Sequence, residues 1–434
     1  MVSNGQWSRR HLLGVGGAAL ALAGVGAPAC AASGGVAIFR GIRYARAERF
    51  GQPEIVPFDE SLIKETRGPI APQAPSRLGL AMGPAAAVPQ DEHCQVLSVF
   101  TPSRAGRRPV MVFLHGGAFV SGAGELPWYD GDKLAGEQDV VVVSVTYRLG
   151  ALGYLQFAGG TAPSPGMSDQ VAALEWVKAN IAKFGGDPGN VTLFGQSAGG
   201  GSIVAMGAWG HGGTLFHRAI VQSGAIPPYA RAQIEEVSAA YLKVLGKDPR
   251  TASAAEIVEA QGKFAAVRPE TTVWLPVGPA APVPLGVPLL CGWTREDNAP
   301  FVLIREKRQP TPGADLAPFR EASRPRIEAA QKLAAETAAA GQKAHLYRFA
   351  WNGPDTGLGD CHTIELPFLL GSEAAWREAP MLAGAPWTEI DRLGRKMRAV
   401  WAAFARTGDP GAAGGTRWPL VTAAAQPVTD LPPG

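Results

Sequence analysis

Short apolar runs recur along the chain from Val36 onward, and stretches with helical periodicity lie between several of them. The runs are rich in β-branched residues and are bounded by Gly, Pro or Asp. This composition is typical of strands that are buried on both faces of a sheet. The runs that predict strands cover residues 109–115, 139–147, 190–195, 218–223, 287–293 and 345–351.

Helical periodicity is clearest over residues 168–184, where apolar residues recur every three or four positions. Ser168 is a candidate N-cap for this helix, and Gly185 is a candidate for the residue that ends it. Further helices are predicted over residues 232–245, 325–340 and 389–406. The alternation predicts an α/β fold, with a mostly parallel central sheet and helices on both of its faces.

Three stretches rich in Pro and Gly interrupt this pattern, and we interpret them as loops within one domain. They cover residues 69–90, 276–288 and 408–419. No clear linker between domains is visible.

The first 32 residues predict an export signal rather than part of the fold. Arg9 and Arg10 precede an uncharged run over residues 12–29, and small residues follow it. The pattern resembles a twin-arginine signal, so we expect a mature domain over 33–434 that is periplasmic or extracellular, with no stable membrane insertion. An uncleaved membrane anchor is the alternative. A lipid anchor on Cys30 is disfavoured because Ala27 stands where a large aliphatic residue is expected.

Composition narrows the function classes. The chain has 434 residues, of which 46% are hydrophobic and 18% charged, as in a globular protein with a large core. The formal net charge is +3, and the two arginines of the leader contribute most of it. This charge argues against a nucleic-acid partner. Four cysteines, one of them in the leader, do not make a disulfide framework.

A serine framed by small residues carries the first chemical signal. The sequence Gly195-Gln196-Ser197-Ala198-Gly199 follows a predicted strand and precedes a plausible helix. This context is that of a nucleophile elbow, a sharp turn that holds a serine in a strained conformation and requires small neighbours. The start of the helix adds backbone N–H groups beside the serine oxygen.

A second motif, His115-Gly116-Gly117-Ala118-Phe119, also follows a predicted strand directly. Small residues at this point let backbone amides approach a ligand oxygen, as in the oxyanion hole of an α/β hydrolase. A turn without chemistry explains either motif alone, but not both motifs in this order.

Together with longer stretches, these motifs resemble the type-B carboxylesterase family, which includes cholinesterases and bacterial para-nitrobenzyl esterases. The resemblance implies an α/β-hydrolase fold that hydrolyses small carboxylic esters. The similar stretches span nearly the whole mature chain and cover residues 39–45, 91–102, 146–155, 166–200, 217–224, 401–410 and 418–420.

The resemblance also locates partners for Ser197. The acid motif of the family matches residues 292–301, where its glutamate falls on Asp297, with Glu296 beside it as the alternative acid. The histidine motif matches residues 361–371, which makes His362 the general base. In this interpretation Ser197 attacks the ester carbonyl, His362 transfers the proton, and the acid orients the imidazole.

Backbone N–H groups of Gly117, Ala118 and Ala198 are expected to form the oxyanion hole, again by resemblance. No metal or other cofactor is expected, because the sequence shows no metal-ligand spacing and no phosphate loop. The expected partner is a small-molecule ester. The sequence leaves the oligomeric state open.

Other features shared with the family are interpreted as structure. The resemblance pairs Glu92 with Arg49 and Arg148 with Asp169 as ion pairs of the scaffold. Breaking such a pair costs about 3–5 kcal/mol if it is buried.

Departures from the family limit the substrate. Gln196 replaces the glutamate of cholinesterases, which weakens a cation site. The segment between Asp297 and His362 is short, which predicts a shortened roof and a more open site. Two alternatives stay open: a non-catalytic binding or adhesion role, and hydrolysis of amides, carbamates or longer lipid esters.

Overall fold

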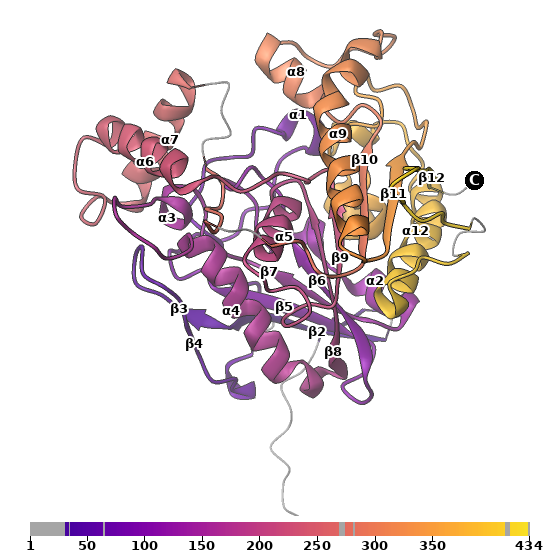
Figure 1. Cartoon of the computed structure of the whole chain (residues 1–434), viewed down its shortest axis with the longest axis horizontal. Coiled ribbons are helices and arrows are strands. Elements are labelled where there is room, and N and C mark those ends of the chain that lie inside the picture. The colour runs from indigo at the N-terminus through magenta and orange to yellow at the C-terminus, as the bar shows by residue number, and fades with distance from the viewer. Residues whose placement is uncertain are drawn as a thin grey trace, which may run out of the picture.

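The computed structural model describes residues 31–33, 35–63, 66–268, 274–280, 283–412 and 417–432. These residues build a ten-stranded sheet with helices on both faces (Figure 1). A separate two-stranded ribbon, β3–β4, lies beside the N-terminal part of the sheet. The predicted α/β architecture is therefore confirmed.

The strands of the main sheet follow the order β1-β2-β5-β7-β6-β8-β9-β10-β11-β12. From β7 to β12 all neighbours are parallel, whereas β1, β2, β5 and β7 pair antiparallel. All six predicted strands are present. The strands are β1 Ala31–Ser33, β2 Val36–Arg43, β3 Ala45–Arg46, β4 Glu54–Ile55, β5 Val96–Thr101, β6 Arg108–Leu114, β7 Val141–Val145, β8 Gly186–Gln196, β9 Arg218–Gln222, β10 Leu289–Thr294, β11 Ala344–Phe349 and β12 Val428–Leu431.

The central strands are apolar at consecutive positions because each face of the sheet has its own core. In β6, Val110 and Val112 belong to one hydrophobic cluster, whereas Met111 and Phe113 belong to the other. Side chains alternate across a strand, so an unbroken apolar run fills both layers. The helices α4, α5 and α9 contribute to the first cluster, and α2 and α12 contribute to the second.

The helices vary in length from one turn to six. The α-helices are α1 Gly79–Met82, α2 Asp132–Gln138, α3 Gly150–Tyr154, α4 Pro165–Asn180, α5 Ala198–Ala208, α6 Arg231–Leu245, α7 Ala254–Val267, α8 Ala299–Glu306, α9 Ala317–Ala339, α10 Leu366–Leu369, α11 Glu373–Trp376 and α12 Trp387–Thr407. Short 3₁₀ helices lie between them in the described residues, namely η1 Glu60–Leu62, η2 Pro127–Tyr129, η3 Ile181–Phe184 and η4 Pro380–Leu382.

The helix predicted over 168–184 is α4, but its start was predicted wrongly. The helix begins at Pro165, and Ser168 lies inside its first turn rather than at the N-cap. Proline is favoured at a first helical position, because its missing N–H would have no partner there. The predicted end is confirmed, since Gly185 adopts a left-handed conformation with φ +76° directly after η3.

The helix predicted over 325–340 is also longer than expected. It is α9, which begins at Ala317 and continues through Pro325. A proline inside a helix removes one backbone hydrogen bond. The helix packs along β10 and β11 and buries Phe319, Ala330 and Ala334. This packing offsets the lost bond.

The short helix α1 lies inside the stretch 69–90 that was interpreted as loop.

The helices α6 and α7 lie together at the edge of the molecule, next to α3 (Figure 1).

No helix in the described ranges is both long and apolar enough to cross a membrane. The predicted leader lies largely outside the described residues, although β1 includes Ala31 and Ala32. The start of the mature domain at residue 33 and the shortened roof over the site stay predictions.

Cys94, Cys291 and Cys361 are buried and free.

Both predicted ion pairs are present, but only one of them is buried. In the first, Arg148 contacts Asp169 at 2.7 and 2.8 Å, and their side chains are 4% and 0% exposed. In the second, Nε of Arg49 lies 2.7 Å from Glu92, and these side chains are 23% and 27% exposed. The large cost of a broken pair is therefore expected only for Arg148 and Asp169.

We expect Asp169→Asn to lower the free energy of unfolding by about 3–5 kcal/mol, because the Arg148 guanidinium would stay buried without a counter-charge. The matched control is Glu92→Gln, where solvent screens the remaining charge and the expected loss is about 1 kcal/mol or less. Urea denaturation followed by tryptophan fluorescence measures both variants. Equal losses would contradict the assignment of Arg148 and Asp169 as the costly pair.

Candidate active site

Ser197 lies on the sharp turn that the sequence predicts between β8 and α5. Its backbone has φ +55° and ψ −118°, a conformation that residues other than glycine rarely adopt. The flanking glycines are required by close packing. A Cβ at Gly195 would lie 2.6 Å from the carbonyl carbon of Gly199, and one at Gly199 would lie 1.9 Å from the oxygen of Leu114. The nucleophile elbow is thus built into the packing of β6, β8 and α5.

Hydrogen bonds hold this turn from both sides. The N–H of Ser197 donates to the carbonyl of Gln222 on β9 at 2.8 Å, and the N–H of Gly201 donates to the carbonyl of Ser197 at 3.0 Å. The strained residue is therefore continuous with the β8–β9 ladder and with the first turn of α5. Such support is what allows a strained conformation to persist.

The loop after β6 approaches the same point. Gly117, Ala118 and Phe119 have φ values of +116°, +54° and +60°, so the chain turns back on itself. The N–H groups of Val120 and Ser121 both donate to the carbonyl of Gly117 at 3.0 Å. The same pocket is lined by Gly117, Ala118 and Ser197. The loop thus brings two of the three expected oxyanion donors to the serine, and the third, Ala198, is the first residue of α5.

His115 opens this loop, and its imidazole is part of the core. The ring stacks on Tyr147 with centroids 4.3 Å apart, and its Nδ1 lies 2.8 Å from the carbonyl oxygen of Gly116. Burial lowers the pKa of His115 to about 4. The residue therefore stays neutral near pH 7 and shapes the loop.

Asp297 and His362 meet at the carboxyl ends of β10 and β11. Oδ1 of Asp297 lies 2.6 Å from Nδ1 of His362, and both side chains are fully buried. Burial alone would raise the pKa of Asp297, but the charges of His362 and Arg326 lower it to about 2. Asp297 is therefore ionised at neutral pH and accepts a hydrogen bond from the imidazole.

Glu296, the alternative acid, is buried but contacts other groups. Its carboxylate lies 2.6 Å from Nε of Arg320 and accepts the N–H of Asp360 at 2.8 Å. Its backbone N–H donates to the carbonyl of Asp360 at 3.0 Å. Glu296 thus fastens the loop that carries His362, whereas Asp297 contacts the imidazole itself.

The other ring nitrogen of His362 contacts Gln196, a residue to which the sequence assigned no role toward the histidine. Nε2 of His362 lies 3.0 Å from Nε2 of Gln196. An amide nitrogen only donates, so Nε2 of the imidazole accepts and the proton of the neutral ring lies on Nδ1. In the described part of the chain, no hydrogen bond joins His362 to the Ser197 hydroxyl.

Two further residues surround the imidazole, and the sequence analysis missed both. Nε of Arg326 on α9 lies 3.4 Å from Oδ1 of Asp297, and its guanidinium lies over the ring of Phe301 at 5.0 Å. Phe301 packs edge-on against His362, with ring centroids 5.0 Å apart. Arg326 lies within the helix predicted over 325–340, but no sequence pattern relates that helix to the acid.

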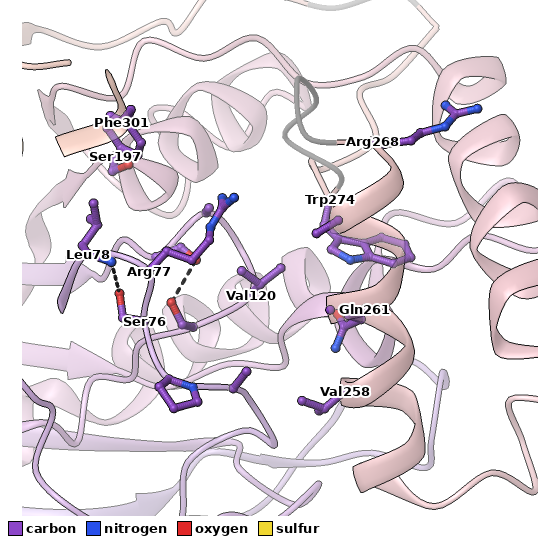
Figure 2. Close-up of a pocket in the computed structure, with 17 residues that line it drawn as sticks. Ser76, Arg77, Leu78, Val120, Ser197, Val258, Gln261, Arg268, Trp274 and Phe301 are labelled. Atoms are coloured by element: carbon purple, nitrogen blue, oxygen red, sulfur yellow. Dashed lines mark hydrogen bonds between the residues drawn. The ribbon is translucent and has the colours of Figure 1, made fainter. Parts of the chain in front are cut away.

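Two cavities adjoin the loop with Gly117, and Ser197 lines the first of them. The first has a volume of about 190 Å³ and lies between the Gly117–Ala118 loop and α7, with Phe301 and Trp274 in its wall (Figure 2). The second has a volume of about 640 Å³, is lined by Gln196 among others, and has no charged residue among its described lining residues. The helix α7, which the sequence analysis did not predict, thus forms one side of the site. Among the described residues, no group of His, Cys, Asp and Glu could hold a metal ion.

Comparisons with known proteins agree with this geometry. A sequence model of the carboxylesterase family matches residues 23–261. A Rhodococcus erythropolis protein named probable N-octanoylanthranilate hydrolase is 38% identical over 424 residues, covering 89% of this chain and 92% of that protein. The para-nitrobenzyl esterase of Bacillus subtilis is 33% identical over 432 residues, covering 87% of each. A solved structure titled thermophilic PNB esterase has a TM-score of 0.78 at 29% identity over 93% of each chain.

A serine on a strained strand–helix turn within a mostly parallel sheet defines an α/β hydrolase. The chain belongs to the carboxylesterase family and is a carboxylic ester hydrolase. The family match ends before Asp297 and His362. Asp297 and His362 are therefore assigned to the site by their motifs and by the geometry described above.

The contact between Gln196 and His362 predicts how the pH profile responds to substitution. We expect His362 to act as a general base in its neutral form, so kcat/KM should rise with pH through the pKa of His362. Burial lowers this pKa below its usual value of 6.5, against the opposing effect of Asp297. In Gln196→Glu, a carboxylate beside Nε2 would stabilise the imidazolium, and we expect the midpoint to rise by about one pH unit or more.

The measurement is kcat/KM for 4-nitrophenyl acetate between pH 4.5 and 8.5. The control is Gln196→Met, which removes the amide without adding charge and should keep the midpoint below the usual value. If Gln196→Glu left the midpoint unchanged, Gln196 would not act on the titrating base.

Proposed function

We propose that Ser197, His362 and Asp297 are the catalytic triad of a serine esterase that cleaves small carboxylic esters through an acyl-enzyme. The 2.6 Å contact between Asp297 and Nδ1 of His362 carries this proposal. It fixes the proton of the neutral imidazole on Nδ1, and Nε2 is left as the acceptor for the serine proton. Glu296 is assigned to the scaffold because its carboxylate is already engaged by Arg320 and the backbone.

The reaction follows from these positions. Ser197 Oγ attacks the ester carbonyl while its proton moves to Nε2 of His362, and the negative oxygen accepts hydrogen bonds from the N–H groups of Gly117, Ala118 and Ala198. Nε2 then returns the proton to the departing alcohol. A water molecule then attacks the acyl-enzyme while its proton moves to Nε2 of His362. Nε2 returns that proton to Ser197 Oγ, and the carboxylic acid is released.

One rearrangement precedes the attack. In the free protein Nε2 of His362 accepts from the Gln196 amide, so Ser197 Oγ must replace that amide. Contacts between catalytic groups often tighten only when substrate is bound. Gln196 therefore holds the imidazole in the correct tautomer until the substrate positions the serine.

The two cavities favour esters with modest groups on both sides of the carbonyl. A second candidate activity is amide hydrolysis, because the relative at 38% identity is named for N-octanoylanthranilate, whose octanoyl group is bound to nitrogen. An amine leaves less readily than an alcohol and needs a well-placed proton donor. Hydrolysis rates for 4-nitrophenyl octanoate and N-octanoylanthranilate, measured side by side, would separate the two activities.

Replacing Ser197 with Ala should lower kcat for 4-nitrophenyl acetate and butyrate by about 10⁴–10⁶-fold, because the nucleophile is removed. Circular dichroism of the variant should match the unaltered protein. Equal turnover by both proteins would remove Ser197 from the mechanism.

The neighbouring acids provide a matched pair within the same assay. Asp297→Asn should lower kcat by about 10⁴-fold, because the wrong imidazole tautomer would be favoured. Glu296→Gln should stay within about tenfold of the unaltered enzyme. A larger loss in Glu296→Gln than in Asp297→Asn would reverse the assignment of the acid.

We also propose that residues 1–32 direct export through a twin-arginine pathway, to the periplasm or the medium. Arg9 and Arg10 directly before an uncharged run support this proposal. Replacing both arginines with lysine should leave the esterase activity in the cytoplasmic fraction of the producing bacterium, while the unaltered chain is exported. Export of the double variant at the same level would argue against this route.

A further inference from the structure

The first cavity beside Ser197 contains an arginine whose charge is not balanced by the described part of the chain. Arg77 lines this cavity and is exposed. No carboxylate of the described residues lies within ion-pair distance of its guanidinium, and none of their hydrogen bonds involves its side chain. In Figure 2 the side chain projects from its loop into the space between Ser197 and Trp274.

The rest of the cavity is apolar or already neutralised. Val120, Val258 and Phe301 contribute apolar surface, and no described Asp or Glu lines the cavity. Its other arginine, Arg268, lies 3.5 Å from Glu236 and points away from Arg77 (Figure 2). Arg77 is exposed, so water screens its guanidinium in part, but no described carboxylate of the cavity competes with an anion for it.

The backbone on both sides of Arg77 is held in place, so the fold sets the point from which the side chain projects. The N–H of Leu78 donates to Oγ of Ser76 at 3.2 Å. The Leu78 side chain is buried, and α1 begins at the next residue. Arg77 is thus carried on a short tethered segment that faces the cavity.

The contacts of His362 indicate which half of the substrate reaches this cavity. The departing alcohol must lie near Nε2 of His362, which gives it a proton. Gln196, whose amide lies 3.0 Å from that nitrogen, lines the second cavity together with Thr363. The second cavity therefore takes the alcohol group, and the first cavity takes the acyl group.

We propose that Arg77 binds a carboxylate at the far end of the acyl group, so that the site prefers half-esters of dicarboxylic acids to neutral esters of the same length. Hydrolysis of such a substrate releases the alcohol and a dicarboxylate. This inference rests on the proposed esterase function and adds a substrate class to it. The planar guanidinium suits two parallel hydrogen bonds to a carboxylate.

The test compares kcat/KM for mono-4-nitrophenyl esters of six-, eight- and ten-carbon dicarboxylic acids with kcat/KM for the corresponding methyl 4-nitrophenyl diesters. The readout is the ratio of the anionic to the neutral substrate, measured on the full chain. A second arm places the carboxylate on the alcohol side, with 4-carboxyphenyl acetate compared with 4-carbamoylphenyl acetate.

We expect the acyl-side ratio to fall by about five- to tenfold in Arg77→Met at one or more chain lengths and to be largely kept in Arg77→Lys. Raising the sodium chloride concentration should lower the ratio in the unaltered protein and in Arg77→Lys, but not in Arg77→Met. The matched control is Arg107→Met, which removes an exposed charge at the opposite end of β6 and should keep the ratio.

Three results would overturn the proposal. A ratio that is the same in Arg77→Met at every chain length would remove Arg77 from substrate selection. A change confined to the alcohol arm would contradict the placement of the acyl group. If the unaltered protein hydrolysed neither the anionic nor the neutral esters, the proposed esterase mechanism would fail first, and this inference would fail with it.

Discussion

The strained backbone of Ser197 is the constraint on which the site depends. A positive φ at a non-glycine residue costs of order 1–3 kcal/mol and persists only where its surroundings impose it. Here β8 enters the turn, the carbonyl of Gln222 on β9 holds its N–H, and α5 leaves it directly. The close contact of Gly199 with Leu114 on β6 permits no side chain there. Three strands and one helix must therefore be assembled before the nucleophile is presented.

The same sheet edge collects the other groups of the proposed active site. The loop with Gly117 follows β6, Asp297 follows β10, and His362 follows β11, so each comes from the carboxyl end of a parallel strand. Ligand sites of open parallel sheets form at this edge, because the loops there converge. The fold thus brings together residues that lie far apart in sequence.

Much of this arrangement was predictable from the sequence, for physical reasons. The central strands were evident because both faces are buried, and Ser197 and His362 were evident because their motifs are long. The family motif favoured Asp297 and left Glu296 open, since adjacent acids look equivalent until their partners are known. These partners are His362 for Asp297 and Arg320 for Glu296. Position alone could not reveal Arg326 or α7, because tertiary packing brings them to the site.

The charges around the site argue for one class of substrate over another. Where cholinesterases carry a glutamate, this chain has the neutral Gln196, and its amide is turned toward the catalytic imidazole. The negative charge of Asp297 is buried; its carboxylate accepts a hydrogen bond from His362 and lies 3.4 Å from Arg326. A cationic ester would therefore meet no exposed counter-charge among the described residues of the first cavity, and it would meet Arg77. An anionic or neutral acyl group would not be repelled by Arg77. The charges of the pocket and the neutral side chain of Gln196 therefore both favour anionic or neutral esters over cationic ones.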